Sequence, residues 1–380
     1  MVSTYFLTIK TRLINVTPHL LLRSFYALSF FFTIFASSLV IYLPMSSYSE
    51  STGLVVRSTG SWYHVMPDSG ATLPCRLRGN YRLHGSKQTN PIAVGDRVDF
   101  QLLDDGTGLI TDIHDRRNYI VRRSTNLSKQ THVIAANIDL LCIVATLGFP
   151  RTSSGFIDRL LVTAEAYHIP AAIIFNKCDL YDDELWQFHN DFKHIYSSVG
   201  YPVLEVSALS GLGLDSLKQL IAGQTVLFSG HSGVGKSAIL NAIDPSLHLR
   251  TGEVSQWSLK GTHTTTFAEI HPISISSQQG SSHQPDISNP PSALQPSTFL
   301  IDTPGIKEFG MVDFQPWELS HFFPEMRPLI LSCRFANCTH RHEPGCAVKA
   351  AVETGQIPSE RYQNYLNILD SIISSAPLRR

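Results

Sequence analysis

Two patterns of hydrophobic residues divide the chain into unlike parts. From residue 53 to about residue 115, short stretches rich in β-branched and aromatic residues are separated by turns, as in GLVVRSTGSWYHVM and GDRVDFQLLDDGTGLITDI. Closely spaced strands without long helical stretches between them favour a small β-barrel, such as an oligonucleotide-binding (OB-fold) barrel. We therefore expect an OB-fold barrel over residues 51–120. Basic residues interleaved with aromatic ones in this region suit an RNA-binding face, and a solvated barrel surface is the alternative.

A second pattern begins after residue 123, where continuous apolar runs alternate with stretches of helical periodicity. Continuous apolar runs indicate strands that are buried on both faces, and their alternation with helices predicts a parallel α/β sheet over residues 121–308. The predicted strands lie at residues 137–147, 170–180, 201–209, 224–230 and 299–305, and the predicted helices at residues 156–168, 184–200 and 213–223. Residues 272–297 are rich in Ser, Gln and Pro and contain no Lys or Arg, which predicts a flexible insertion. Residues 309–380 are expected to form a small helical domain.

The composition limits the class of protein. The 380 residues are 43% hydrophobic and 16% charged, and 30 Lys+Arg against 31 Asp+Glu give a net charge of -1. This apolar fraction is high enough to build cores, which excludes a chain that is disordered throughout, and too low for a polytopic membrane protein. The neutral balance argues against a histone-like binder of polyanions, although a local basic face remains compatible with it.

The first 50 residues are interpreted as a leader or an over-extended N-terminus and are left out of the fold. Before Met45 the chain carries Lys10, Arg12 and Arg23 but no acidic residue, and the run at residues 25–43 is long enough to span a bilayer. A signal anchor, an organelle-targeting segment and a translation start at Met45 are the three interpretations. The last agrees with a sequence that looks nowhere secreted after this segment, so we expect no stable membrane association.

A phosphate-binding loop is predicted between the strand that ends at Ser229 and the following helix. Residues 230–237 read GHSGVGKS, which is the motif G-x-x-x-x-G-K-[ST] in the strand–loop–helix context that it requires. Backbone N–H groups of such a loop converge on the β-phosphate, the lysine reaches the β- and γ-phosphates, and the hydroxyl ligates Mg²⁺. The residues assigned to this loop are Gly230, His231, Ser232, Gly233, Val234, Gly235, Lys236, Ser237 and Ala238. We expect His231 to face solvent rather than to act as a general base.

The base of the bound nucleotide is predicted to be guanine. Asn176, Lys177 and Asp179 belong to an N-K-x-D sequence at the end of a predicted strand, and Ser207-Ala208 follow the next strand. The Asp carboxylate can accept hydrogen bonds from guanine N1–H and the 2-amino group, a donor pattern that adenine lacks. Asn176 can tie this loop to the phosphate loop, the Lys177 stem can cover the ring, and a backbone N–H after Ser207 can bind the guanine oxygen.

The residues around Mg²⁺ and the γ-phosphate are predicted from two further segments. Asp302 opens a D-T-P-G sequence that ends at Gly305, so Asp302 would hold Mg²⁺ through water and the Gly305 N–H would sense the γ-phosphate. In the sequence GTHTTT at 261–266 we assign Thr265 to the Mg²⁺ shell, with either neighbour as the alternative. The catalytic set is therefore Lys236, Ser237, Thr265, Asp302 and Gly305.

The order of these motifs is permuted. Ordinary GTPases have the phosphate loop first and the guanine-specificity elements last, whereas here N-K-x-D and S-A precede the phosphate loop and D-T-P-G. A sheet tolerates new termini if the old ends are joined, so the same site can assemble. The permutation leaves the segment after D-T-P-G at the end of the domain, where a further domain has to anchor it.

A structural zinc site is predicted near the C-terminus. Cys333, Cys338, His340 and Cys346 supply three thiolates and one imidazole, which is the number of ligands that closes a tetrahedral zinc shell and leaves no open position for catalysis. His342 is the alternative ligand. Six cysteines in 380 residues are too few for a disulfide framework, which agrees with a reducing compartment.

Taken in this order, the motifs resemble those of the RsgA (YjeQ) family, the circularly permuted GTPases of small-ribosomal-subunit assembly. The resemblance extends from about residue 53 to residue 373 and includes GSWYHV and NPIAVGDRV in the barrel. It implies a multidomain fold: an OB-fold barrel, an α/β circularly permuted P-loop GTPase and a small α-helical zinc-binding domain. It also implies a cytoplasmic, monomeric GTP hydrolase that uses GTP, Mg²⁺ and one Zn²⁺, and whose barrel and zinc domain contact 16S-type rRNA of the 30S subunit.

The long insertion and the leader are departures from the family pattern. Ile306 stands where many GTPases place a water-orienting Gln, so we expect slow intrinsic hydrolysis that the ribosome stimulates. Three alternatives stay open: a GTP-gated RNA-binding switch that barely hydrolyses, a GTPase of the large subunit or another ribonucleoprotein particle, and a membrane-tethered regulator.

Overall fold

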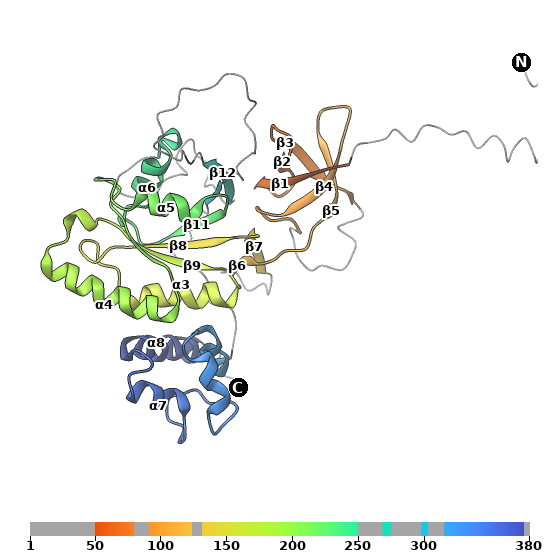
Figure 1. The fold of residues 1–380 in the computed structure, drawn as a ribbon. Helices are drawn as coiled ribbons and strands as arrows, with labels where there is room; N and C mark the ends of the chain where they lie inside the picture. Colours follow the sequence, from red (N-terminus) through yellow and green to blue (C-terminus); the bar gives the residue numbers. More distant parts are fainter. Residues whose placement is uncertain are drawn as a thin grey trace, which may run out of the picture. The chain divides into compact units, whose positions relative to one another are not determined.

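The computed structural model describes residues 50–79, 91–123, 131–249, 268–273, 275, 298–302 and 315–375 (Figure 1). The chain divides into two units, residues 1–49 and 50–380, and every described residue belongs to the second. The apolar run at 25–43 and its three interpretations lie outside the described residues. Within the described ranges, no helix is long and apolar enough to cross a membrane.

A closed barrel follows the N-terminal segment, as expected. Its strands are β1 (Glu50–Ser58), β2 (Tyr63–Pro67), β3 (Leu73–Leu77), β4 (Arg97–Leu102) and β5 (Gly108–Ile113). Each pairs with the next in the order β1-β2-β3-β5-β4, and β4 pairs back onto β1, which closes the barrel. Alternate residues of these strands point inward, as period-2 patterning requires. Gly108 is needed where β5 passes β3, because a Cβ there would lie 2.5 Å from Cys75 Sγ.

The predicted parallel sheet is present next to the barrel in the chain. Its strands lie in the order β10-β9-β8-β11-β13, all parallel, and β12 pairs antiparallel with β13. Their bounds are β8 (Leu140–Ala145), β9 (Ala171–Phe175), β10 (Val203–Glu205), β11 (Thr225–Ser229), β12 (Glu269–Ile273) and β13 (Thr298–Asp302). The six residues of β8 are all buried, which explains why its sequence shows no polar alternation.

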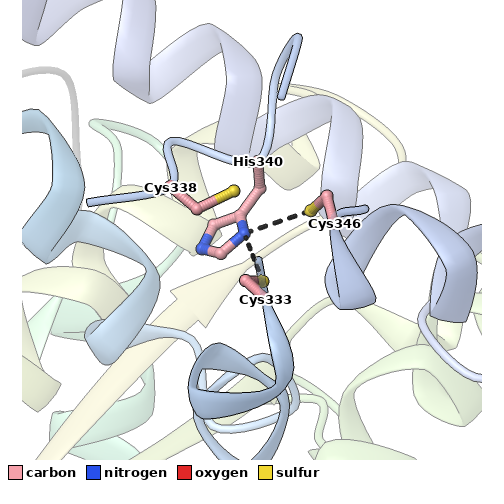
Figure 2. A group of neighbouring side chains, drawn as sticks. All are labelled: Cys333, Cys338, His340 and Cys346. Atoms are coloured by element: carbon pink, nitrogen blue, oxygen red, sulfur yellow. Dashed lines mark hydrogen bonds between the residues drawn. The ribbon is translucent and has the colours of Figure 1, made fainter. Parts of the chain in front are cut away.

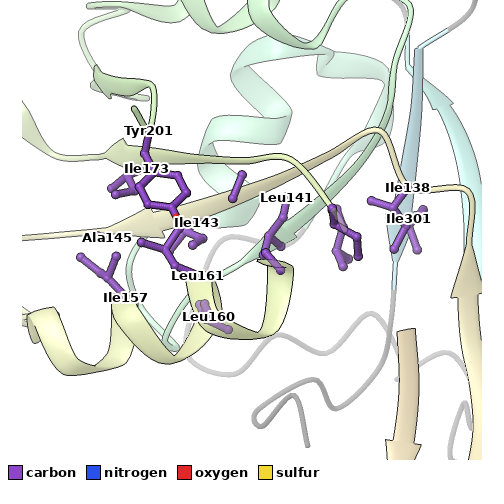
Figure 3. Close-up of a cluster of buried hydrophobic side chains, with 14 of the residues drawn as sticks. Ile138, Leu141, Ile143, Ala145, Ile157, Leu160, Leu161, Ile173, Tyr201 and Ile301 are labelled. Atoms are coloured by element: carbon purple, nitrogen blue, oxygen red, sulfur yellow. The ribbon is translucent and has the colours of Figure 1, made fainter. Parts of the chain in front are cut away.

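Helices cover both faces of this sheet. They are α3 (Ser154–Ala166), α4 (Asp183–Val199), α5 (Leu214–Ile221) and α6 (Lys236–Ile243), with short 3₁₀ turns η2 (Cys178–Leu180) and η3 (Pro245–Leu247). Residues from α3 and α4 share one core with Leu141 and Ile143 of β8. Figure 3 shows the α3 and β8 side chains of this core. Residues from α5 and α6 share a second core with Cys142 and Val144. Successive side chains of β8 thus point to opposite helical layers.

Two elements differ from the sequence-based expectation. A hairpin of β6 (Tyr119–Arg123) and β7 (Thr131–Ala136) lies between the barrel and the sheet in the chain, where no strands were predicted. Of the segment 272–297, which was predicted to be a flexible insertion, Pro272 and Ile273 belong to β12 and pair with Phe299 and Thr298. The rest of the segment, apart from residue 275, lies outside the described residues. A proline is compatible with this position because β12 pairs with the barrel only at Glu269, so its far side is an edge there.

The C-terminal part is helical around its own small core. It contains the 3₁₀ segments η4 (Pro316–Phe322) and η5 (Arg327–Ser332) and the helices α7 (Ala347–Glu353) and α8 (Ser359–Ser375). Leu319, Phe323 and Tyr365 are fully buried in this core, and Val162 of α3 packs into it. The C-terminal part is therefore anchored on a helix of the parallel sheet domain.

A buried polar network fixes this anchoring. The Arg361 guanidinium in α8 donates to Asp158 of α3 and, at 2.7 and 3.1 Å, to both carboxylate oxygens of Glu325. Asn364 Nδ2 donates to the other Asp158 oxygen at 2.7 Å. The side chains of Asp158 and Arg361 are 0% and 1% exposed, so each charge depends on the other for its solvation.

Replacing Arg361 by Met should therefore leave Asp158 as a buried, uncompensated charge. We expect a loss of unfolding free energy of about 3–5 kcal/mol, measured by urea denaturation. The control is Arg117→Met, which removes a pair with Asp139 whose arginine side chain is 65% exposed and should cost at most about 1 kcal/mol. Equal losses in the two variants would contradict the anchoring role of the buried network.

Candidate nucleotide site and metal centre

The phosphate loop connects the end of β11 to the start of α6. Its glycines take conformations that other residues avoid: φ is 82° at Gly233 and 94° at Gly235. A Cβ on Gly235 would lie 2.3 Å from Asn176 Nδ2, and one on Gly230 would lie 2.3 Å from the Val144 carbonyl oxygen. The motif glycines are thus required by close approach to the neighbouring strand ends as well as by backbone conformation.

The first turn of α6 presents polar groups to this loop. The first backbone bond of the helix runs from Ile239 N–H to the Gly235 carbonyl, so the N–H groups of residues 236–238 have no intrahelical acceptor. Lys236 Nζ donates to the carbonyl oxygens of Gly230 at 2.7 Å and His231 at 2.8 Å. Burial of this ammonium lowers the pKa of Lys236. A phosphate placed in the loop would meet unpaired N–H groups and a cation.

Asn176 links the phosphate loop to the ends of two other strands. It is buried at the end of β9, and its Nδ2 donates to the Val234 carbonyl oxygen at 2.8 Å. Its Oδ1 accepts from the Ala208 N–H, beyond β10, at 3.3 Å. One amide side chain therefore joins the N-K-x-D, S-A and phosphate-loop segments. The hydrogen bond from Asn176 to Val234 is the predicted link between the N-K-x-D sequence and the phosphate loop.

The other residues of the two predicted base-binding segments lie at the same edge of the sheet. Lys177 has φ of 64° and donates from Nζ to the Phe149 carbonyl oxygen at 3.0 Å. Asp179 lies in η2 and is exposed, so its carboxylate can reach a ligand. Ser207 is buried, and its hydroxyl accepts from the Ser210 N–H at 3.0 Å, which shapes the turn that follows β10.

The predicted Mg²⁺ and γ-phosphate residues fall largely outside the described part of the chain. Thr265 and Gly305 are not among the described residues, nor is Ile306. Of Asp302 the backbone is described, at the end of β13. Because β13 pairs in parallel with β11, that strand end lies at the same edge as the phosphate loop.

One contact of the loop was not anticipated from sequence. His231 is exposed, as expected, yet its ring stacks on Phe156 in the first turn of α3, with centroids 3.6 Å apart and an angle of 29° between the planes. Partial burial of the imidazole, together with the charge of Lys236, lowers the pKa of His231. Phe156 carries no motif, so the helical periodicity around it predicts a core residue and nothing more.

The four predicted metal ligands come together (Figure 2). The ligand atoms of Cys333, Cys338, His340 and Cys346 all lie within 4.8 Å of one another. His340 Nδ1 lies 3.3 Å from Cys346 Sγ and 3.6 Å from Cys333 Sγ, so Nδ1 is the nitrogen turned towards the thiols. His342, the alternative, is exposed and outside the group. Three thiols and one imidazole fit a closed tetrahedral zinc shell.

Comparisons with known proteins agree over most of the chain. Residues 113–279 match the RsgA GTPase family and residues 52–110 match the RsgA N-terminal domain. A small ribosomal subunit biogenesis GTPase RsgA of Bacteroides fragilis is 46% identical over 318 residues, which are 84% of this chain and 96% of that protein. One of Flavobacterium johnsoniae is 47% identical over 322 residues, 84% of this chain and 93% of that protein.

Two solved structures are similar as well. YjeQ from Thermotoga maritima superposes with a TM-score of 0.68 at 32% identity, covering 86% of this chain and 100% of the other. YloQ, described as a circularly permuted GTPase, has a TM-score of 0.63 at 27% identity, covering 88% of this chain and 98% of the other.

Proposed function

The chain belongs to the RsgA family of GTPases and is a GTP hydrolase, and on this premise we propose that it assists late assembly of the small ribosomal subunit. In this proposal it binds the 30S subunit with GTP, hydrolyses the nucleotide to GDP and phosphate, and then leaves. The observation that carries the nucleotide site is the pair of Asn176 hydrogen bonds, which hold both base-binding segments against the phosphate loop.

The guanine base would lie against Lys177 and Asp179, with the 2-amino group and N1–H donating to the Asp179 carboxylate. The Ala208 N–H would bind the guanine oxygen once its 3.3 Å bond to Asn176 is shared or released. Phosphates would occupy the loop that Lys236 now spans, and the Lys236 ammonium would exchange the two carbonyl oxygens for phosphate oxygens. This exchange is favourable because an ammonium group makes stronger hydrogen bonds to charged phosphate oxygens than to neutral carbonyl oxygens.

Mg²⁺ would be held by Ser237, Thr265 and, through water, Asp302, and would neutralise charge that develops on the phosphates. The Gly305 N–H would contact the γ-phosphate when GTP is bound. The side chain of Ile306, the next residue in the sequence, has no polar atom with which to orient the attacking water. The isolated enzyme should therefore be slow, and the ribosome should supply the missing orientation.

The RNA partner we propose is 16S-type rRNA, contacted by the barrel and the C-terminal domain. On the barrel, the guanidinium of the exposed Arg76 lies 3.8 Å from the centre of the ring of Trp62, which is half-buried. Basic and aromatic side chains placed together in this way can bind phosphates and stack bases. Tyr63, by contrast, is buried in the barrel core. We propose that the protein acts as a monomer in the cytoplasm, where ribosomal subunits assemble.

Turnover of GTP with and without ribosomal subunits tests this function. We expect slow hydrolysis by the protein alone and a rate at least about tenfold higher with purified 30S subunits, but not with 50S subunits. Lys236→Ala should abolish activity in both conditions, because it removes the phosphate-binding cation. A rate unaffected by 30S subunits, or raised only by 50S subunits, would refute the proposed role in the small subunit.

The zinc proposal predicts one tightly bound Zn²⁺ per chain, held by Cys333, Cys338, His340 and Cys346. Metal analysis of the purified protein should give a stoichiometry near one, and Cys338→Ser should lower it strongly because a closed shell loses a ligand. His342→Ala is the matched control and should keep the metal. Full zinc content in Cys338→Ser, or equal loss in the control, would contradict this ligand set.

A further inference from the structure

The stack of His231 on Phe156 joins the phosphate loop to a helix that is 75 positions earlier in the chain. His231 is the second residue of the loop, and its own carbonyl oxygen accepts a hydrogen bond from Lys236 Nζ at 2.8 Å. The ring and the acceptor of the phosphate-binding lysine therefore belong to one residue. When the His231 ring is held in place, the orientation of the His231 peptide group is restricted. Lys236 Nζ has to leave the carbonyl oxygen of this group when a phosphate binds.

The helix that carries Phe156 is fixed on two other sides. Ile157 and Leu161 are buried against the parallel sheet (Figure 3). Asp158 is buried in the network with Arg361, and Glu165 near the other end pairs with Arg327 at 2.7 Å. A helix anchored to the sheet and to the C-terminal part offers a rigid surface for a glycine-rich loop, whose own backbone has few constraints.

We propose that Phe156 is a positioning residue of the nucleotide site. Its ring holds His231 and thereby sets the geometry of the phosphate loop before nucleotide enters, which lowers the ordering cost of binding. The inference rests on the proposed function, since the loop it positions is the assigned phosphate site. Phe156 itself does not have to touch the nucleotide.

Nucleotide affinity of three single variants tests this role. Phe156→Leu keeps an apolar side chain but removes the ring, and we expect the dissociation constant for GDP to rise about three- to tenfold, the range that one stacked pair supplies. Phe156→Tyr keeps the ring and should stay within about twofold of the unchanged protein. The matched control is Tyr119→Leu, which removes an aromatic neighbour of Tyr167 at the opposite end of α3 and should also stay within about twofold.

A double-mutant cycle separates positioning from a general loss of stability. In a His231→Ala background, adding Phe156→Leu should change GDP affinity no further, because the partner ring is already absent. With GTP and 30S subunits, Phe156→Leu should raise KM and leave kcat within about twofold, as expected for an interaction equally present in the ground and transition states.

The outcomes distinguish the inference from the function on which it rests. Unchanged GDP affinity in Phe156→Leu, an equal loss in Tyr119→Leu, or additive effects with His231→Ala would each overturn the positioning role while leaving the nucleotide site in place. Failure of the unchanged protein to bind GDP would instead overturn the nucleotide site, and the inference with it.

Discussion

The hydrogen bonds of Asn176 are the interaction on which the proposed nucleotide site depends. Parallel strands direct their carboxyl ends to one edge of a sheet, so the segments after β9, β10 and β11 are brought together whatever their order along the chain. Asn176 then fixes their separation through the Val234 carbonyl and the Ala208 N–H. Gly235 is required for the same reason, since a side chain there would occupy the position of the Asn176 amide.

The permuted order of the motifs places β13 at the end of the sheet domain, next to the C-terminal helices in the chain. Among the described residues no strand follows β13 in the chain, and residues 315–375 form the C-terminal helices instead. Their attachment to α3 through Asp158 and Arg361 places a buried ion pair between the two parts. Since Phe156 lies two residues before Asp158, the same helix contacts both the phosphate loop and the C-terminal part. The proposed nucleotide site and the C-terminal part that contains the Cys/His cluster thus share one helix.

Much of this architecture could be predicted because its signals are local. The buried strands, the phosphate loop and the Cys/His spacing each follow from short patterns, and the structure places their residues at one sheet edge or in one cluster. The stack of Phe156 on His231 and the pairing of Asp158 with Arg361 could not be predicted, since both contacts join residues far apart in the chain and Phe156, Asp158 and Arg361 belong to no motif. The β6–β7 hairpin and β12 were missed because polar residues and a proline interrupt the strand pattern.

Base selectivity tests the central claim most directly, that the permuted segments form one guanine nucleotide site. Xanthine carries a carbonyl oxygen where guanine has its 2-amino group, so Asp179→Asn, whose amide donates to that oxygen, should bind XTP better than GTP while the unchanged protein prefers GTP. Competition of the two nucleotides for both proteins measures this directly. Reversal of the preference is the predicted result. An unchanged preference for GTP in Asp179→Asn would show that Asp179 does not read the base and would contradict the assigned site.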